Sequence, residues 1–403
     1  MVNVAVLGYG TVGSGVVEVI EKNKDMVNKK SGQELNVKYI LDLRDFPGDP
    51  YADKVVHDFE QIVNDDEVAI ICETMGGVGA AYQFTKAALE RGKSVCTSNK
   101  ELVAKHGPEL LQTAHANNCN YLFEASVGGG IPIIRPLNYS LTAERIEGIT
   151  GILNGTTNYI LTKMEREGAD FADVLKEAQE KGYAERNPEA DVEGHDACRK
   201  IAILSSLMMG MNVDSEKIYT EGITKVSADD FVYARAAGKT IKLLARSTAM
   251  GEDRVMAMVA PFMLDKDKPL AMVNDVFNAV LVTGNMLGDS MYYGRGAGKL
   301  PTASAVVSDV VDCARHLGKI IMCFWEERDA EIADISDQES CYFVRVKASA
   351  RAAAEAAFAG CETLEVPGRT EDFALFTRSL KEKDFAAKCE ALGSDVESHI
   401  RLY

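Results

Sequence analysis

The sequence predicts an α/β protein whose first domain is a Rossmann-type, doubly wound parallel sheet. Two observations carry this prediction. A β-branched run over residues 2–7 leads into a turn with Gly8, Gly10 and Gly13, and apolar residues at helical spacing follow. Strand-like and helix-like segments then alternate to about residue 123, and such alternation is typical of a mostly parallel sheet.

Composition narrows the class of protein. The 403 residues suggest two or three domains, because one core stops growing at roughly 250 to 300 residues. The net charge of −17 argues against nucleic acid and anionic membranes as partners. The nine cysteines are scattered singly, which indicates reduced thiols and a cytoplasmic protein. Strand-like residues begin at Val2, so we expect no signal peptide, and the longest apolar stretch, 201–213, is too short to span a bilayer.

Each glycine of the first turn has a predicted role. Gly8 allows the tight turn, Gly10 lets the backbone approach a pyrophosphate, and Gly13 lets helix and strand pack closely. The diphosphate would then lie at the helix N-terminus, where unpaired N–H groups favour negative charge. The alternative is an ordinary tight turn between a strand and a helix.

The other elements of the first domain follow in order. We expect strands over residues 37–41, 68–72, 94–97 and 120–123, and helices over 80–91 and 102–117. Parallel sheets bind ligands at the carboxyl ends of their strands. Three loops lie there: 73–77 with Thr74, 98–100 with Lys100, and 124–126. Ordinary turn chemistry is the alternative for each loop, and a solvated surface lysine is the alternative for Lys100.

The end of the second strand bears on the choice of cofactor. It carries Asp42 and Arg44. An acid near this point commonly holds the ribose 2′-OH of NAD, whereas an arginine accommodates the 2′-phosphate of NADP. The sequence favours NADP through Arg44 and leaves NAD open.

Three segments after the first sheet each allow two interpretations. Residues 123–137 leave the sheet through three glycines and Pro132, so they form either a loop whose carbonyls face a cation or a domain junction. Residues 154–161 form either a helix N-terminus that faces substrate or cofactor, or an ordinary helix start capped by Thr156 or Thr157. The Gly-rich segment 292–310 is either a loop that closes over the cofactor or a mobile linker.

Residues 183–200 hold the strongest candidates for chemistry. A helix over about 195–209 places Asp196 and Lys200 one turn apart on one face. That helix is apolar nearly all round, so it is expected to be buried. A lysine partly removed from water, with another cation such as Lys100 nearby, can titrate closer to neutral and transfer a proton. The alternative is a surface ion pair worth about 0.3 to 0.5 kcal/mol.

Together these motifs resemble the homoserine dehydrogenase family. The resemblance covers about residues 1–320 and is carried, in chain order, by GYGTVG, TSNKELVAKHG, FEASVGGGIPII, NGTTNYIL, GYAERNPEADVEGHDACRK and YYGRGAGKLPTASAV. It implies NAD(P)H-dependent reduction of L-aspartate 4-semialdehyde to L-homoserine, and the reverse, on the route to threonine, methionine and isoleucine. It also implies a homodimer or homotetramer.

The resemblance implies roles for single residues. Lys200 matches the proton donor and acceptor, and Lys100 matches a second lysine at the cofactor and the substrate. The substrate-binding residues are Gly182, Glu185, Asp191 and Asp196. The cofactor-binding residues are Gly8, Gly10, Thr11, Val12, Gly13, Arg44, Thr74, Lys100 and Gly298. A structural sodium ion, held by backbone oxygens, corresponds to Glu124, Val127, Gly129 and Ile131.

The last part of the chain predicts a small α+β module. Its elements are a strand over 340–348, a helix over 350–359, strands over 363–366 and 373–379, a helix over 384–392 and a strand over 396–403. The order βαββαβ resembles the ACT regulatory domain, but KASARAAAEAA replaces the usual Asp-x-Pro-Gly turn. We therefore hypothesise weak or no inhibition by threonine. The expected domains are 1–130 for NAD(P), an α+β catalytic and dimerisation domain over 131–325, and 337–403.

Two other functions remain as alternatives at this stage. One is a different NAD(P)-dependent amino-acid or semialdehyde dehydrogenase, although no cysteine nucleophile stands out. The other is a non-catalytic nucleotide sensor, against which the set of Glu185, Asp196 and Lys200 argues.

Overall fold

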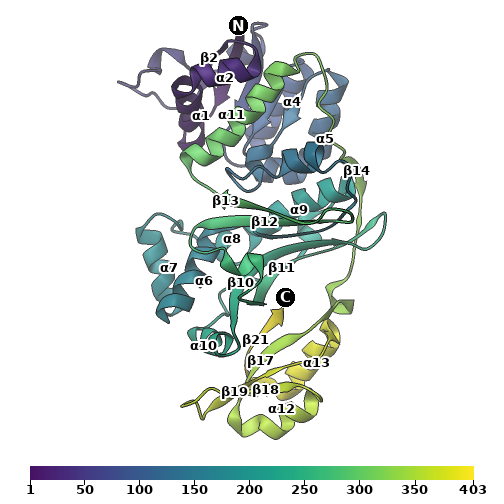
Figure 1. Cartoon of the computed structure of the whole chain (residues 1–403). Helices are drawn as coiled ribbons and strands as arrows, with labels where there is room; N and C mark the ends of the chain where they lie inside the picture. Colours follow the sequence, from purple (N-terminus) through teal and green to yellow (C-terminus); the bar gives the residue numbers. More distant parts are fainter. The chain divides into compact units, whose positions relative to one another are not determined.

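The computed structural model describes residues 1–403, which form two compact units (Figure 1). The first unit comprises residues 1–146, 202–215 and 283–330, and the second comprises 147–201, 216–282 and 331–403. The domain limits expected from the sequence stay predictions. None of the helices combines the length and the apolar character that crossing a membrane would need.

The first unit contains the predicted parallel sheet. Its strands are β1 (Val2–Leu7), β2 (Leu35–Leu41), β3 (Val55–Val56), β4 (Val68–Glu73), β5 (Ser94–Thr97) and β6 (Tyr121–Leu122). They lie in the order β3-β2-β1-β4-β5-β6, and all neighbours are parallel. The strand order reverses between β1 and β4, because successive strands are added on one side of β1 up to β3 and on its other side from β4 on. Sheets of this type bind ligands at such a reversal. The Rossmann-type prediction is confirmed.

Helices flank this sheet, and one of them comes from far along the chain. The helices are α1 (Thr11–Lys22), α2 (Lys24–Ser31), α3 (Glu60–Val63), α4 (Gly79–Glu90), α5 (Lys100–Ala116) and α11 (Lys299–Arg315). Helix α11 packs along α1, as Figure 1 shows, and Val306 and Val310 share a buried core with Val16. Helix α11 therefore shares a buried core with α1, the helix that follows the glycine turn. The unit also contains β8 (Met211–Asn212), β13 (Gly288–Arg295) and β14 (Glu326–Asp329).

The second unit is built on a larger sheet. The two long strands β10 (Lys239–Ala249) and β11 (Arg254–Asp265) pair antiparallel along their whole length. The other strands are β7 (Ile146–Ile152), β9 (Tyr219–Thr220), β12 (Phe277–Gly284) and β15 (Glu331–Ile332). The helices are α6 (Gly155–Glu167), α7 (Phe171–Glu180), α8 (Glu189–Val192) and α10 (Ala228–Ala236), together with the first half of α9 (His195–Met209), whose residues from 202 on belong to the first unit. Helix α9 has the predicted bounds.

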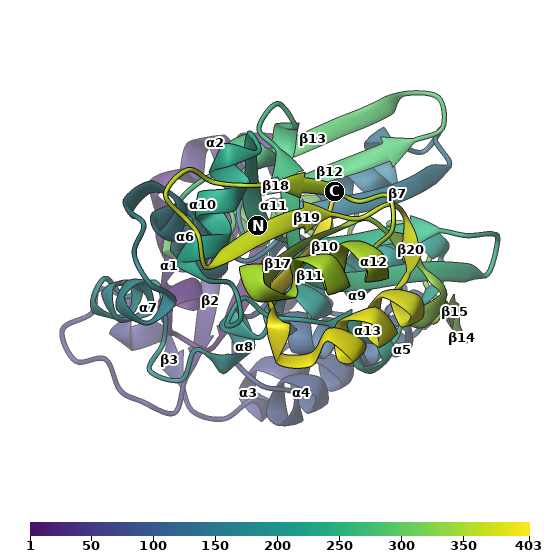
Figure 2. The ribbon, with the colours of Figure 1, turned by 90° about the horizontal axis from the view of Figure 1, so that it is seen from below.

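The end of the chain adds a module whose longer elements follow the predicted order βαββαβ; two short strands, β16 (Glu339–Ser340) and β20 (Leu380–Lys381), pair antiparallel in addition. Its elements are β17 (Tyr342–Lys347), α12 (Arg351–Ala357), β18 (Glu362–Leu364), β19 (Asp372–Phe376), α13 (Glu382–Leu392) and β21 (Val396–Leu402). Both helices lie on one face of the strands (Figure 2), and Phe358 and Phe385 pack there against Tyr342. Strand β21 also pairs with β11 through Phe262 and Arg401, so the module extends the sheet of the second unit.

Candidate active site

The first turn of the chain has the geometry that its glycines predict. Gly8 follows β1 with φ +88°, a conformation that favours glycine. A Cβ on Gly13 would lie 1.9 Å from the carbonyl oxygen of Gly8, so no side chain fits there. A Cβ on Gly10 would meet nothing within 4 Å, so the backbone at Gly10 borders open space. Helix α1 begins at the next residue, Thr11, and directs its first N–H groups toward this turn.

A cavity lies beside the glycine turn at the carboxyl edge of the sheet. Its volume is about 570 Å³, which is within the usual range of small-molecule sites. The hydroxyl of Thr74 lies 3.0 Å from Leu7 O and 2.9 Å from Gly8 O, and thus links the loop after β4 to the turn. The lining residues include Gly8, Gly10, Asp42, Arg44, His57, Thr74, Met75 and Gly76. Open space at Gly10 and the helix N-terminus fit a dinucleotide diphosphate.

One end of this cavity carries an ion pair. The guanidinium of Arg44 makes two bonds to the carboxylate of Asp42, Nε–Oδ1 at 2.9 Å and Nη2–Oδ2 at 3.0 Å. The hydrogen bonds from Arg44 lower the pKa of Asp42 to about 2. Both ring nitrogens of His57 face oxygens, Asp42 O at 2.7 Å and Asp45 Oδ1 at 3.1 Å. The hydrogen bond to the backbone of Asp42 raises the pKa of His57.

Lys100 is the first residue of α5, at the end of the loop after β5. Asn99 caps this helix, because its Oδ1 accepts a hydrogen bond of 3.2 Å from Leu102 N. The amide of Asn99 donates to Gly77 O at 2.6 Å and so joins the loops after β5 and β4. Gly298, the predicted cofactor-binding glycine that lies outside the first turn, directly precedes α11 and has φ +119°.

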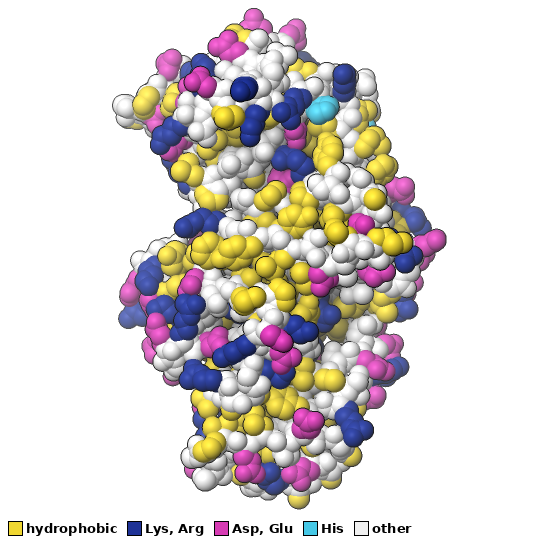
Figure 3. Space-filling model, in the orientation of Figure 1, with side chains coloured by type: hydrophobic (Ala, Val, Ile, Leu, Met, Phe, Trp, Pro, Cys, Tyr) yellow, Lys and Arg dark blue, Asp and Glu magenta, His cyan; other side chains and the backbone are white.

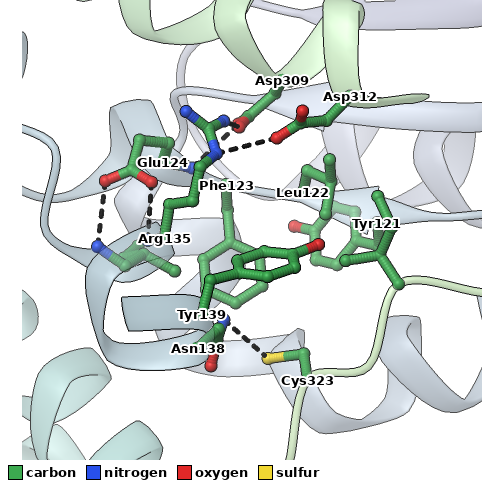
Figure 4. A pocket seen from close by; sticks show the side chains of 12 residues that line it. Tyr121, Leu122, Phe123, Glu124, Arg135, Asn138, Tyr139, Asp309, Asp312 and Cys323 are labelled. Atoms are coloured by element: carbon green, nitrogen blue, oxygen red, sulfur yellow. Dashed lines mark hydrogen bonds and ion pairs between the residues drawn. The ribbon is translucent and has the colours of Figure 1, made fainter. Parts of the chain in front are cut away.

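The predicted cation loop, residues 124–131, is buried and tightly constrained. The carboxylate of Glu124 accepts hydrogen bonds from the backbone N–H groups of Ile133 at 2.6 Å, Ile134 at 2.9 Å and Arg135 at 2.7 Å (Figure 4). Both oxygens of this carboxylate therefore already accept hydrogen bonds from N–H groups. Glu124 can bind a cation only through its backbone carbonyl oxygen. Burial raises the pKa of Glu124.

The backbone of this loop leaves carbonyl groups for a ligand. Gly130 N donates to Arg295 O and Ile131 N donates to Gly128 O, but no backbone N–H donates to the carbonyls of Val127, Gly129 or Ile131. A Cβ on Gly129 would lie 2.4 Å from Gly296 O. Carbonyl oxygens are suitable ligands for a hard cation, so the loop fits one.

A buried charge cluster lies next to this loop and fixes it to α11. Arg135 pairs with Asp309 at 2.5 Å and with Asp312 at 2.8 Å, and Asp309 accepts a hydrogen bond of 2.9 Å from Glu124 N (Figure 4). Burial raises the pKa of Asp309 well above its ordinary value. The guanidinium of Arg135 thus compensates the charge of the buried Asp309 and of the partly buried Asp312.

Replacing Arg135 with methionine should therefore destabilise the protein strongly. Removing one partner of a buried ion pair leaves an uncompensated charge, which costs about 3 to 5 kcal/mol. The measurement is the free energy of unfolding in urea. Arg315→Met is the matched control, because Arg315 is half exposed and 3.8 Å from Asp312, and its loss should cost below about 1 kcal/mol. Equal losses for the two variants would contradict the role of the cluster.

The second unit holds the predicted acid and lysine in one buried group. Lys200 is only 8% exposed and Asp196 only 4%. The ammonium of Lys200 donates to Asp196 Oδ2 at 2.6 Å and to the carbonyl oxygen of Leu153 at 2.7 Å. The surface-pair alternative is wrong. Burial with two polar partners keeps the ammonium in one place.

Asn154 organises this group, and sequence reasoning missed it. Its amide donates to Asp191 Oδ1 at 2.7 Å and to Asp196 Oδ2 at 2.9 Å. Its Oδ1 also caps α6 by accepting from Thr157 N at 2.9 Å. The predicted caps Thr156 and Thr157 were wrong, because an asparagine side chain just before the helix reaches its third residue. The signal was present as Asn-Gly ahead of a helical pattern.

The remaining predicted substrate residues, Gly182 and Glu185, lie on the exposed loop after α7. The hydroxyl of Thr156 donates to Tyr183 O at 2.7 Å, so this loop is attached to the start of α6. The structure therefore gathers Asp191, Asp196 and Lys200 around Asn154, whereas the side chain of Glu185 is directed to solvent. Asp191 of α8 and Asp196 of α9 share the amide of Asn154, which joins these two helices at one polar site.

Comparison with known families identifies relatives over most of the chain. A family model described as homoserine dehydrogenase matches residues 132–311, and one described as its NAD-binding domain matches residues 8–124. The homoserine dehydrogenase of Synechocystis sp. is 47% identical over 317 residues, which is 77% of this chain and 73% of the relative. That of Bacillus subtilis is 42% identical over 323 residues, 78% of this chain and 73% of the relative.

Solved structures give the same result. A homoserine dehydrogenase from Thiobacillus denitrificans has a TM-score of 0.91 at 35% identity, covering 100% of this chain and 98% of that one. A hyperthermophilic archaeal homoserine dehydrogenase in complex with NADPH has a TM-score of 0.66 at 30% identity, covering 77% of this chain and 97% of that one.

Proposed function

The chain belongs to the homoserine dehydrogenase family, and on that premise we propose that Lys200 exchanges the proton with the substrate oxygen. The family confirms the resemblance found in the sequence. The protein is an NAD(P)-dependent oxidoreductase that interconverts L-aspartate 4-semialdehyde and L-homoserine. Its place on the route to threonine, methionine and isoleucine is part of the proposal.

One observation carries the role of Lys200: its ammonium is buried and held at fixed distances by Asp196 and Leu153 O. When bound, the dihydronicotinamide supplies a hydride to the aldehyde carbon. The carbonyl oxygen then becomes an alkoxide, and it must gain a proton. A fixed ammonium stabilises that negative charge and donates the proton; in the reverse direction the neutral amine accepts it.

The acids near Lys200 are proposed to bind the substrate. Both substrates carry an α-ammonium group, which carboxylates recognise. Asp191 and Asp196 are held by Asn154, so their oxygens have fixed positions. Glu185 and Gly182 belong to the exposed loop and are proposed to contact the substrate from there. Asp196 has a second task, because it neutralises the buried charge of Lys200.

The glycine-turn cavity is proposed to hold the cofactor. Gly8, Gly10 and Gly13 allow the diphosphate to approach the start of α1. The N–H groups of Thr11 and Val12 lie in the first turn of that helix, which favours a negative group. The residues proposed to bind the cofactor further include Arg44, Thr74, Lys100 and Gly298.

Arg44 supports a preference for NADP, with NAD as the alternative. We expect Arg44→Ser to raise the KM for NADPH about tenfold or more while the KM for NADH changes little, because only NADPH carries the 2′-phosphate. The two KM values, measured with saturating L-homoserine or semialdehyde, check this. Arg44→Lys keeps the charge and should lose less. Equal KM increases for both cofactors would contradict the assignment.

A monovalent cation, sodium by likeness, is proposed at the loop of Glu124, Val127, Gly129 and Ile131. The carbonyl oxygens of Val127, Gly129 and Ile131, to which no backbone N–H donates, support it. The C-terminal module is proposed to be an ACT-like domain, which its element order supports. Self-association as a homodimer or homotetramer is supported by exposed apolar side chains around β13, where apolar residues gather in Figure 3; they include Met286, Leu287 and Met291.

One assay tests the function as a whole. NADPH and NADH absorbance is followed with aspartate semialdehyde, and NADP and NAD reduction is followed with L-homoserine. We expect turnover with this pair of substrates and none with other semialdehydes at equal concentration. Cofactor binding without turnover on any amino-acid substrate would favour the nucleotide-sensor alternative.

A further inference from the structure

We propose that Glu73 is a positioning residue whose carboxylate holds the two loops at the carboxyl edge of the nucleotide sheet in the form that binds the nicotinamide cofactor. The inference rests on the proposed function only in taking that edge as the cofactor site. Glu73 is the last residue of β4 and has no exposed surface. No step of the reaction uses it, so its burial as an acid needs another reason.

The first argument is where the carboxylate lies. Glu73 stands opposite Leu7 of β1 and opposite Thr97 of β5, at the point where the chain order reverses. Its Oε1 accepts a hydrogen bond of 2.8 Å from Met75 N, in the loop after its own strand. Its Oε2 accepts a hydrogen bond of 2.6 Å from the hydroxyl of Thr97, at the end of the next strand. One carboxylate therefore connects both loops.

The second argument is the chain of hydrogen bonds that starts at this carboxylate. The hydroxyl of Thr97 donates to Glu73 and accepts from Asn99 N at 2.9 Å. Asn99 then caps α5 through Leu102 N, and its amide reaches Gly77 O. Lys100, the first residue of α5, follows directly. Thr97 donates its single proton to Glu73 Oε2 while Met75 N donates to Oε1, and only the ionised carboxylate offers acceptors on both oxygens without carrying a proton of its own.

The third argument is that this carboxyl can change its charge near neutral pH. Burial raises the pKa of Glu73 to about 7, against hydrogen bonds from Thr97, Met75 and Asn99 that favour the ionised form. No charged side chain contributes to this value. The titratable group that faces it is the phenol of Tyr121 on β6, which stays neutral because burial and the charge of Glu73 raise its pKa. From α11, Asp309 faces Arg135 instead.

Protonation would therefore loosen the two loops. A protonated carboxyl has one acceptor site fewer and must itself donate a proton. The hydroxyl of Thr97 already accepts from Asn99 N, so a second donor would leave its own proton without an acceptor. The loop with Thr74 and Met75 and the loop with Asn99 and Lys100 then lose their common support.

The test is a titration of NADH binding, followed by nicotinamide fluorescence between about pH 6 and about pH 8. NADH is used because it has no 2′-phosphate to titrate. For the parent protein we expect affinity to fall as the pH falls, with a midpoint near 7, the pKa of Glu73. We expect Glu73→Gln to bind NADH about tenfold more weakly at the upper pH, as the loss of a hydrogen bond to a charged group implies, and to show no pH dependence.

Two controls separate this result from others. His57→Gln removes the histidine that lines the cavity and whose pKa is raised by the hydrogen bond to the backbone of Asp42, and it should keep the pH dependence of the parent. Thr97→Val breaks the hydrogen-bond chain without touching Glu73 and should weaken NADH binding in the same way, whereas Thr97→Ser should restore it. The titration needs no turnover, so its result stands whether or not Lys200 is the proton donor.

Stability serves as a further control. The folded-state pKa of Glu73, about 7, lies above its ordinary 4.5, so this group stabilises the fold below about 4.5 and that contribution is lost as the pH rises to 7. Glutamine does not ionise, so the Glu73→Gln variant loses no stability in this way as the pH rises. This variant should therefore be at least as heat-stable as the parent at about pH 8.

The proposal is overturned if Glu73→Gln binds NADH within about twofold of the parent and keeps its pH dependence. If Glu73→Gln does not fold, the same criterion is applied to Thr97→Val. A parent protein that binds no NADH at any pH would overturn both this proposal and the cofactor site on which it rests.

Discussion

Lys200→Met should lower kcat by about 10³-fold while the dissociation constant of NADPH changes by less than about twofold. The reason is that Lys200 supplies the proton that the new alkoxide needs. Methionine cannot donate a proton, and its apolar side chain does not bind a water molecule that could donate one instead. Methionine has nearly the same length as the stem of lysine and keeps the apolar contacts of α9. The measurements are kcat from nicotinamide absorbance and NADPH binding from fluorescence.

Lys163→Met is the matched control for this variant. Lys163 also forms an ion pair with an acid four residues away, Glu167, at 2.6 Å, the same distance as that between Lys200 and Asp196. Lys163 lies on α6, away from the polar group around Asn154. The kcat of the Lys163→Met variant should therefore stay within about twofold of that of the parent. If Lys200→Met lost NADPH affinity as strongly as turnover, its role would be structural.

Gly13→Ala should have the second largest effect of the substitutions considered, and this effect should be a loss of folding stability. The added Cβ would lie 1.9 Å from Gly8 O and 2.8 Å from Thr74 Oγ1. The first of these is backbone, which cannot move aside without breaking the turn between β1 and α1. We expect a loss of about 3 kcal/mol or more in the free energy of unfolding, measured by urea denaturation without cofactor.

Gly10→Ala provides the contrast, because nothing lies within 4 Å of a Cβ on Gly10. This variant should keep the stability of the parent within about 1 kcal/mol. It should nevertheless bind NADPH more weakly, since the new methyl group enters the space proposed for the diphosphate. If Gly10→Ala and Gly13→Ala were equally stable, the division of roles between the glycines would be wrong.

Much of the fold could be predicted because its signals are local. The β-branched run before Gly8 and the alternation after it correctly predicted the parallel sheet, and helix α9 has the bounds read from its apolar pattern. The order of the last six elements also followed from local alternation. The pairing of β21 with β11 did not, because Phe262 and Arg401 are far apart in the sequence and nothing local encodes their contact.

The candidate site was predictable only in part, for the same reason. Asp196 and Lys200 are one helical turn apart, so their pairing could be derived from spacing. The contact of Lys200 with Leu153 O and the bridge made by Asn154 depend on how α6 meets α9. Glu73 looked like an ordinary strand end, since burial of a single acid leaves no periodic pattern in a sequence.

A structure of the ternary complex with NADP and L-homoserine would test the central claim most directly. The account predicts the Nζ atom of Lys200 within about 3.2 Å of the hydroxyl oxygen of homoserine, the distance of a hydrogen bond through which a proton moves. It would be contradicted if another side chain held that hydroxyl while Lys200 remained bound only to Asp196 and Leu153.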